Sequence, residues 1–420
     1  MNDSTATEIN SRYNTKVYNG HLPPVVKEGK AELNTLAALQ AFTFAHKNIN
    51  SKTTRAILLN ANISFNEGFI GIEATDLESS IKLELPCDTP KSGAGVLVPT
   101  GRILSILKNA KSKKLETVTL EVVAIDEEIK LKVTAGKNSY TLNTMDPEEF
   151  PEISSLDESI DTLQVPMETF NEAARRVIFA VAIERGCYAL NGIYLSFKPK
   201  KIVTVGTDGK RLSMSEYDYK CDSDYYLKIE NVIIPPKFLS DASGMFNHDH
   251  DVTLQITEGR IALRGKAHKI SKTNENPTGY LELSHCLIEG NFPKFRDVIP
   301  KDCDTIIEID RKKFIEAIKD AATMTSEEHQ AVHFNIDTET NEWVLSSGTP
   351  EAGKFEGRVD IEVTSAPCTC IAFDPRFLMD YLKKDKDAET IRVEMKGLKT
   401  PGMFYGSKGW TYLCSPINLE

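Results

Sequence analysis

The sequence has no long apolar run. No stretch of its 420 residues approaches the roughly 18 consecutive apolar residues that a membrane-spanning helix needs. The opening segment, MNDSTATEINSRYNTKVYNG, has no apolar core of the kind that defines an export signal. Its polar composition predicts a flexible tail over residues 1–28. We therefore expect a cytoplasmic protein that makes no membrane contact.

Motifs for catalysis and nucleotide binding are also missing. The sequence contains no GxxxxGK(S/T), GxGxxG or GxSxG motif. His329 and His333 lack the glutamate of an HExxH helix. Segment 248–251, His-Asp-His-Asp, predicts a charged loop tip, because no further Cys or His partner follows at a recognisable spacing. We expect no catalytic residue, no cofactor and no metal.

Cysteines are few and never form a CxxC pair. Their scatter along a long chain without an export signal predicts reduced thiols and no disulfide framework. Cys368 and Cys370 are at strand spacing, which favours a packing role. The eight cysteines are Cys87, Cys187, Cys221, Cys286, Cys303, Cys368, Cys370 and Cys414.

The charge is negative overall but unevenly placed. The net charge of −11 argues against a nucleic-acid binder, because such proteins usually carry an excess of positive charge. Acids cluster at 146–149 and 157–158, whereas the segment after Pro99 has no acid before Glu116. Either solvated helix faces or a surface that follows a DNA backbone fits this pattern. The cations of that segment are Arg102, Lys108, Lys111, Lys113 and Lys114.

The chain contains a repeat. One unit, an amphipathic helix followed by a strand, occurs three times. The copies are 33–45 with 56–63, 167–182 with 190–195, and 311–322 with 332–336. A second unit follows each copy, with a strand that ends in proline and then a helix. Its prolines, Pro99, Pro236 and Pro375, are 137 and 139 residues apart.

The repeats predict an α+β protein of three modules, each with two helices packed on antiparallel sheets. After the tail at 1–28, we place the modules at 29–157, 158–302 and 303–420, with polar crossings near 157 and 302. The two helices of a module would cover one face of its sheets. Their outer faces would then remain available to a partner.

The stretch 205–213, VGTDGKRLS, is the strongest local candidate for a site. Asp208-Gly209 is a turn pair after an apolar strand, and the glycine can take a positive φ. The turn would present Lys210 and Arg211 beside the apolar Leu212, which favours a docking surface. A hydrolase or transferase using Asp208 and Lys210 is the enzymatic alternative, although no acid–base cluster accompanies them.

Several segments together resemble the bacterial DNA polymerase III beta subunit, the DNA sliding clamp. They are LNGIYL at 190–195, TDGKRL at 207–212, IIPP at 233–236, EGNFPKFRDVIP at 289–300 and SPINLE at 415–420. Residues ATDLE at 74–78 and FPEI at 150–153 also fit. The similarity covers roughly residues 30–420, in the same order as the repeats.

The resemblance implies a head-to-tail homodimer that forms a ring of six modules around duplex DNA. Helices would line the hole, and contacts with DNA would be independent of sequence. Such a clamp is not an enzyme, and it tethers a polymerase for processive synthesis. Expected partners are the DNA polymerase III catalytic subunit, the clamp loader, and other polymerases and repair proteins that carry short clamp-binding peptides. A specialised paralogue serving repair polymerases or drug resistance is the alternative within the family.

The resemblance also implies a pocket for partner peptides between the second and third modules. Lys210, Asp297 and Ser415 depart from some relatives, as does the added charge of Glu420, so the peptide preference at the rim stays open. Carried over by position, the pocket residues are Leu190, Thr207, Gly209, Lys210, Arg211, Leu212, Pro293, Val298, Leu413, Ser415, Pro416 and Ile417.

DNA contacts are carried over less directly. Lys52 and Tyr188 lie after the first helices of modules one and two, where family members touch DNA. The segment from about 265 to 277 and the tail are longer than the family needs. Further candidates on the predicted helix faces are Arg102, Arg175, Arg176, Lys237 and Lys313.

Overall fold

A computed structural model describes most of the chain. The described residues are 29–87, 94–126, 128–157, 160–183, 188–198, 201–218, 231–268, 279–326, 330–349, 353–367 and 370–417. The predicted tail, most of the 265–277 segment, His329 and the side chain of Tyr188 lie outside this description. Within it, no helix combines the length and apolar character needed to cross a bilayer.

Three successive segments share one element order, in which a strand, a helix and three strands occur twice. The first contains β1 (Lys30–Asn34), α1 (Thr35–Lys47), β2 (Asn60–Asn66), β3 (Phe69–Thr75), β4 (Ser79–Pro86), β5 (Gly95–Pro99), α2 (Thr100–Ser112), β6 (Thr117–Ile125), β7 (Glu128–Ala135) and β8 (Asn138–Asn143). The second contains β9 (Thr162–Pro166), α3 (Met167–Val177), β10 (Ile193–Lys198), β11 (Lys201–Thr207), β12 (Arg211–Asp218), β13 (Asn231–Ile234), α4 (Pro236–Met245), β14 (Asp251–Ile256), β15 (Arg260–Lys266) and β16 (Tyr280–Cys286).

The third segment repeats the order with one additional short strand, β21. It contains β17 (Thr305–Asp310), α5 (Arg311–Ala322), β18 (Val332–Asp337), β19 (Glu342–Thr349), β20 (Gly353–Asp360), β21 (Glu362–Ser365), β22 (Cys370–Phe373), α6 (Pro375–Lys384), β23 (Thr390–Met395), β24 (Gly402–Tyr405) and β25 (Trp410–Cys414). Short 3-10 helices are η1 (Ala56–Leu59), η2 (Pro147–Glu149), η3 (Ile178–Ala180), η4 (Tyr188–Asn191) and η5 (Phe295–Val298).

Each helix begins directly after a strand, where the sequence supplies a cap or a proline. The Asn34 side chain accepts the Leu36 N–H at 3.0 Å, and Asp310 accepts the Lys313 N–H at 2.9 Å. Such caps satisfy N–H groups that have no partner within the helix. Pro236 and Pro375 occupy the first turns of α4 and α6, where a missing N–H has no cost.

The structure shifts some predicted boundaries. Residues 56–59, expected to begin a strand, form η1, and β2 starts only at Asn60. The helix expected over 167–182 ends at Val177 and continues as η3. Apolar periodicity alone does not separate a strand from one turn of 3-10 helix. The helix over 311–322 is confirmed.

Two antiparallel sheets continue from one module into the next. The eight-stranded sheet runs β5-β2-β3-β4-β16-β15-β14-β9, so the β4–β16 pair joins the first and second modules. The nine-stranded sheet runs β13-β10-β11-β12-β25-β24-β23-β17-β21, and its β12–β25 pair joins the second and third. Two four-stranded sheets, β1-β6-β7-β8 and β20-β19-β18-β22, lie at the opposite ends of the chain.

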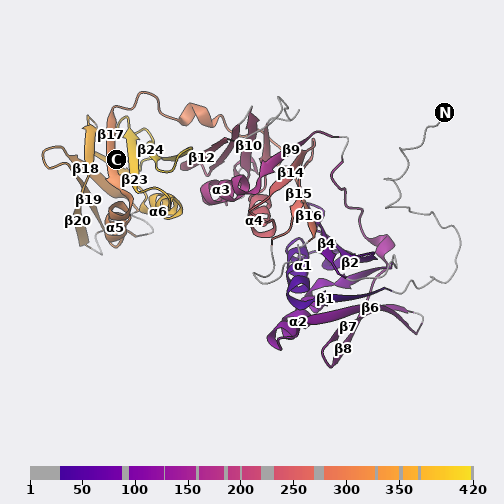
Figure 1. Cartoon of the computed structure of the whole chain (residues 1–420). Coiled ribbons are helices and arrows are strands. Elements are labelled where there is room, and N and C mark those ends of the chain that lie inside the picture. The colour runs from indigo at the N-terminus through magenta and orange to yellow at the C-terminus, as the bar shows by residue number, and fades with distance from the viewer. Residues whose placement is uncertain are drawn as a thin grey trace, which may run out of the picture.

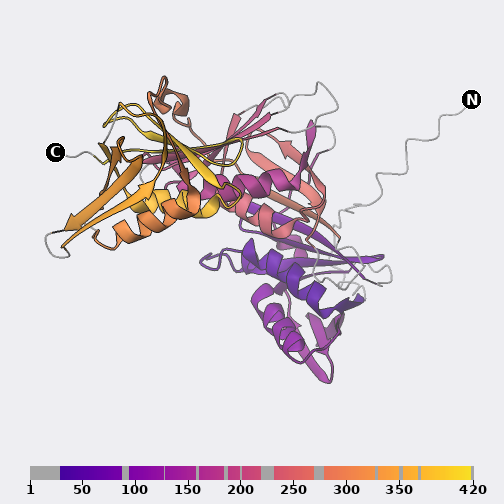
Figure 2. The same ribbon diagram turned by 60° about the vertical axis from the view of Figure 1, so that its left-hand side comes forward.

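The modules follow one another along an arc. The six α-helices of the described residues lie along its concave side and the sheets along its outer side (Figure 1). The turned view in Figure 2 keeps the helices on one side of the sheets. Helix residues such as Phe42, Phe238 and Phe314 are almost fully buried against the sheets. The apolar face of each helix therefore forms the core, and its polar face points into the concavity.

Candidate partner-binding surface and helix-lined face

The turn between β11 and β12 is held by its own side chains. Thr207 Oγ1 donates to the Arg211 carbonyl at 2.6 Å and accepts the Gly209 N–H at 3.1 Å. Asp208 Oδ1 accepts the N–H groups of Lys210 and Arg211 at 2.9 and 3.0 Å. Gly209 has a φ of 85°, a conformation that glycine adopts without steric cost. These bonds use Asp208 as a structural cap, so the enzymatic alternative gains no support from the geometry.

An apolar cluster lies next to this turn, across the β12–β25 pair. Leu212 faces Leu413 in the register, and both are at least 96% buried, at 4% and 2% exposure. They pack with Val203, Val205, Phe295 and Met403. Because Phe295 belongs to η5, the connection between the modules also covers this face of the sheet. An apolar side chain of a partner could extend such a cluster.

Arg211 ties the turn to α6 of the third module. Its Nε donates to Asp208 Oδ2 at 2.9 Å and its Nη1 to Asp380 Oδ2 at 2.6 Å. The guanidinium lies 4.6 Å from the ring centroid of Phe377, a cation–π distance. Burial lowers the pKa of Arg211, but its hydrogen bond with Asp380 and the charge of Asp208 raise it, and the net shift is upward. Arg211 is therefore a fixed cation that supports the surface.

The chain after β25 returns to the same place. The Ser415 N–H donates to the Lys210 carbonyl at 2.9 Å, and the Ile417 N–H to the Ala372 carbonyl at 2.8 Å. Residues 207–212, 413 and 415–417 are thereby brought together, and we call them the 2–3 junction surface. The side chains of Ser415, Pro416 and Ile417 are each half-buried there.

Three predicted pocket residues come from neighbouring segments. Pro293 and Val298 flank Phe295 of the cluster, and Val298 is 53% exposed. Leu190 is in η4, where its carbonyl accepts the Ala182 N–H at 3.1 Å. Their participation in a peptide pocket stays a prediction.

Four cations of the first module are exposed, three on α2 and one in the loop after α1. Lys52 and Arg102 are exposed, as are Lys108 and Lys111 of α2. Within the described residues, none of these four side chains lies within 4.0 Å of a carboxylate. Neither α1 nor α2 contains an acidic residue. This part of the concave side therefore presents uncompensated positive charge.

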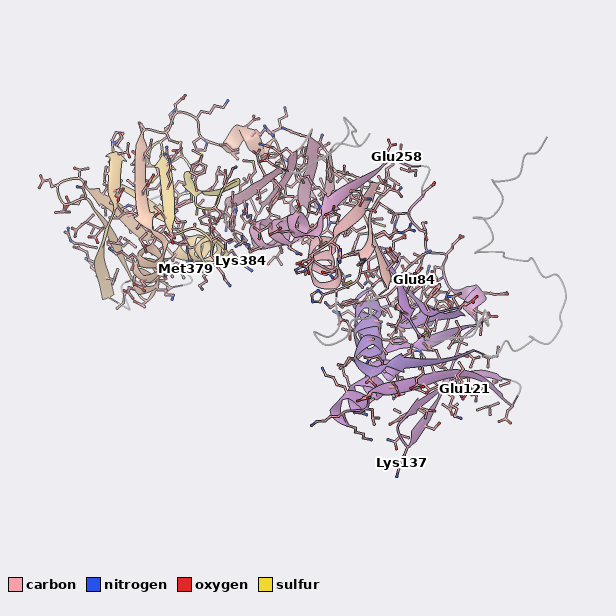
Figure 3. All side chains as sticks on the ribbon, in the orientation of Figure 1. Glu84, Glu121, Lys137, Glu258, Met379 and Lys384 are labelled. Carbon is pink, nitrogen blue, oxygen red and sulfur yellow. The ribbon has the colours of Figure 1, made fainter. Side chains whose placement is uncertain are left out.

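The DNA contact predicted for Arg175 and Arg176 stays a prediction, but both side chains have partners within the chain. Arg176 is only 8% exposed, and its Nη1 donates to Ser215 Oγ and the Lys408 carbonyl. Arg175 donates to Asp387 at 2.8 Å and to the Lys384 carbonyl at 2.7 Å. Figure 3 shows Lys384 on α6, on the concave side close to α3. Both arginines join the second and third modules.

Lys237 and Lys313 are exposed like the first-module cations, but paired like Arg175 and Arg176. Both lie on the helix-lined face, but each is paired, Lys237 with Asp241 and Lys313 with Asp360, both at 2.7 Å. Since Lys313 is 56% exposed, water screens its pair. Their contact with DNA stays a prediction, weaker than that of Arg102. The described residues contain no group of three or more His, Cys, Asp or Glu side chains that could hold a metal.

Comparison with known families gives the same architecture. Residues 32–154 match the N-terminal domain of the DNA polymerase III beta subunit, 164–294 its central domain and 296–403 its C-terminal domain. The chain belongs to the DNA polymerase III beta subunit family. The boundaries at 157 and 302 stay our own division.

Relatives and solved structures of the beta-subunit family match along most of the chain. The beta sliding clamp of Bacillus subtilis is 26% identical over 364 residues, covering 84% of this chain and 90% of that protein. The beta sliding clamp of Chlamydia trachomatis is 26% identical over 349 residues, covering 83% and 77%. A crystal structure of the Bacillus subtilis DNA polymerase sliding clamp has a TM-score of 0.80 at 22% identity, covering 94% of this chain and 100% of that one. The Thermotoga maritima DNA polymerase III beta subunit has a TM-score of 0.77 at 24% identity, with 93% and 100% coverage.

Sequence reasoning missed the residues that join the modules of this chain. Asp380 and Phe377 hold Arg211, and Asp387 holds Arg175. Both acids belong to the third module, far along the chain from their partners, so no local motif reveals the pairing. The sequence contained one hint that Arg211 is a paired cation. Asp208 lies three residues before it in the same turn, at a spacing that allows an ion pair.

Proposed function

We propose that this chain is a DNA sliding clamp that forms a homodimeric ring around duplex DNA. The observation that carries the proposal is how the modules join. At both junctions, the last strand of a module's first half pairs with the last strand of the next module's second half. These pairs are β4 with β16 and β12 with β25.

The same strand-pairing rule identifies one further pair of strands, whose edges have no partner within the described chain. By repeat position β20 corresponds to β4 and β12, whereas β8 corresponds to β16 and β25. Both are end strands of their sheets in the described chain. They lie at opposite ends of one arc, so β20 would pair with β8 of a second copy. Since two arcs offer two such contacts, a head-to-tail dimer closes into a ring.

The concave side would then become the wall of a hole. Exposed cations such as Arg102 and Lys111 would contact phosphates, which carry no sequence information. The contacts need only be weak, because the closed ring keeps the protein on DNA. The proposed role involves no chemistry on a substrate, and it would place the protein with the chromosome in the bacterial cytoplasm.

The 2–3 junction surface would hold the partners. Polymerases, the clamp loader and repair proteins would insert a short extended peptide beside Leu212 and Leu413. Burying one leucine-sized side chain contributes about 1.5–3 kcal/mol, so a few anchors give micromolar affinity. Tethering raises the effective concentration of a polymerase at the primer end.

The test combines oligomeric state with topology. Light scattering after size exclusion should give a dimer, and protein loaded by its clamp loader onto nicked circular DNA should stay bound until the DNA is linearised. A stable monomer, or retention that does not depend on free DNA ends, would contradict the proposal. A linear DNA blocked at both ends should retain the protein as the circle does.

A further inference from the structure

The turn at the first junction repeats the turn of the 2–3 junction surface bond for bond. Thr75 Oγ1 donates to the Ser79 carbonyl at 2.8 Å and accepts the Leu77 N–H at 3.0 Å, as Thr207 does for Arg211 and Gly209. Asp76 Oδ1 accepts the Ser79 N–H at 2.6 Å, in the role of Asp208.

The chain that follows the paired strand also takes the same path. The Cys286 N–H donates to the Glu78 carbonyl at 2.7 Å, which corresponds to the bond between Ser415 and Lys210. The first junction therefore has the same backbone platform as the second. Different side chains stand on it.

Leu77 stands where the second junction has Gly209. Its φ is 77°, a conformation that costs a non-glycine residue roughly 1–2 kcal/mol. The side chain is 44% exposed, so burial in the core does not repay this strain. A large apolar residue held in such a conformation at the surface indicates a contact that the chain alone does not make.

The apolar pair of the second junction is replaced by polar groups at the first. Ser80 faces Ser284 in the register, where Leu212 faces Leu413. Arg260 covers this pair, and its Nη2 donates to Ser80 Oγ at 3.3 Å and to Ser284 Oγ at 3.1 Å. Its Nη1 donates to Cys286 Sγ at 3.2 Å, and this thiol also approaches the Leu77 carbonyl.

Arg260 has no counter-ion among the described residues. It is half-buried, yet its side-chain bonds go only to neutral hydroxyl and thiol groups. Arg264, four residues along the same strand, is paired with Glu282 at 2.9 Å, so that carboxylate is already used. A half-buried guanidinium without an anion is unfavourable, and it has more N–H donors than its three bonds use.

We propose that the first junction is a second binding site, which takes an extended acidic peptide of a partner protein. A carboxylate of the peptide pairs with Arg260, and an apolar side chain beside it packs on Leu77. Paired Arg–carboxylate bonds supply orientation as well as affinity, which suits a partner that already holds the 2–3 junction surface. The site does not depend on encirclement of DNA, so it stands even if the chain fails to close a ring.

Fluorescence anisotropy with the full chain tests this site. The probe is a fluorescein-labelled peptide Gly-Leu-Glu-Glu-Gly, measured in a Leu212→Ala, Pro416→Ala background to disable the other surface. We expect Arg260→Gln to weaken binding at least about fivefold. The matched control Arg392→Gln, which removes an exposed arginine of the outer sheet, should have no effect. The peptide Gly-Leu-Gln-Gln-Gly should bind as weakly as the acidic peptide does to the Arg260 variant.

A second variant separates binding from folding. Leu77→Gly relieves the positive φ, so it should leave the melting temperature unchanged or raise it while weakening the peptide at least about threefold. Equal binding by Arg260→Gln and its control, or by both peptides, would overturn the proposal. Displacement of the acidic peptide by a short DNA duplex at equal ionic strength would also overturn it, because the site would then serve nucleic acid.

Discussion

Arg211 and Asp380 form an ion pair at 2.6 Å between two different repeats, from the β11–β12 turn to α6. Asp380 is 50% exposed, whereas Arg211 is only 11% exposed and retains Asp208 as a second partner. Asp380→Asn should lower the free energy of unfolding by about 1 kcal/mol. It should also weaken a partner peptide a few-fold, because the turn is then less firmly oriented.

Denaturant unfolding and peptide titration measure these two effects. The matched control is Glu128→Gln, which breaks the pair of a 72% exposed carboxylate with Lys130. That variant should change neither quantity. If both variants behave alike, Arg211 and Asp380 do not support the surface.

A double variant tests the peptide surface itself. Leu212→Ala with Pro416→Ala removes an apolar contact and a half-buried proline ring next to it. We expect at least a tenfold loss of affinity for a clamp-binding peptide, since about 1.4 kcal/mol corresponds to tenfold. The dimer should persist in size exclusion. Leu398→Ala, at an apolar side chain that is 58% exposed elsewhere in the third module, should leave affinity unchanged.

Charge reversal on α2 tests the helix-lined face. Arg102→Glu with Lys111→Glu should weaken direct binding to a short linear duplex, most clearly at low salt, where phosphate contacts are strongest. An equal charge change at Arg392 on β23 and Lys399 in the turn after it, Arg392→Glu with Lys399→Glu, is the control. Arg176→Gln should lower stability, because this side chain joins two modules. Equal duplex affinity of the α2 variant and its control would remove α2 from the DNA contact.

The proposed seam has its own test. Leu142 on β8 and Phe355 on β20 are half-buried apolar residues on the two end strands. Replacing either with aspartate should yield monomers at concentrations where the unchanged chain is dimeric, because a carboxylate would be buried in the contact. Tyr280→Asp, at an aromatic side chain that is 58% exposed on β16, should remain dimeric. If the Leu142 variant and the Phe355 variant both remain dimeric, the dimer contact lies elsewhere than at β8 and β20.

Local pattern predicted the repeated elements, because periodicity is set by neighbours in the chain. The helix at 311–322 and the turn at 208–209 follow from such short-range signals. The partners of Arg175 and Arg176 could not be predicted, because a cation on a helix face gives the same local sequence pattern whether solvent or another module lies opposite. Their partners Asp387 and Lys408 come more than 200 residues later, at 212 and 232 positions of separation. Contacts of this kind are fixed by how the modules pack, which composition and spacing do not encode.

His285 is the buried group through which we expect acid to weaken the first junction. It is 4% exposed on β16, and neither ring nitrogen has a hydrogen-bond partner in the described structure. Burial, with the charges of Lys237 and Arg260, lowers its pKa from 6.5 to about 4, and Asp76 acts in the opposite direction. In the unfolded chain this histidine is therefore protonated below about pH 6.5, whereas in the folded chain it is protonated only below about pH 4.

Stability should accordingly be complete above pH 6.5 and decrease as the pH falls towards 4, by about 3 kcal/mol over the whole window. Denaturant unfolding at fixed protein concentration between these limits measures the loss. His285→Leu should flatten this pH dependence and leave stability at pH 7 equal or higher, because it removes two unpaired polar atoms from the core. His248→Leu, at an exposed histidine, should keep the original slope. If His285→Leu keeps it too, the acid sensitivity arises from other groups, and the histidine is not held neutral by its surroundings.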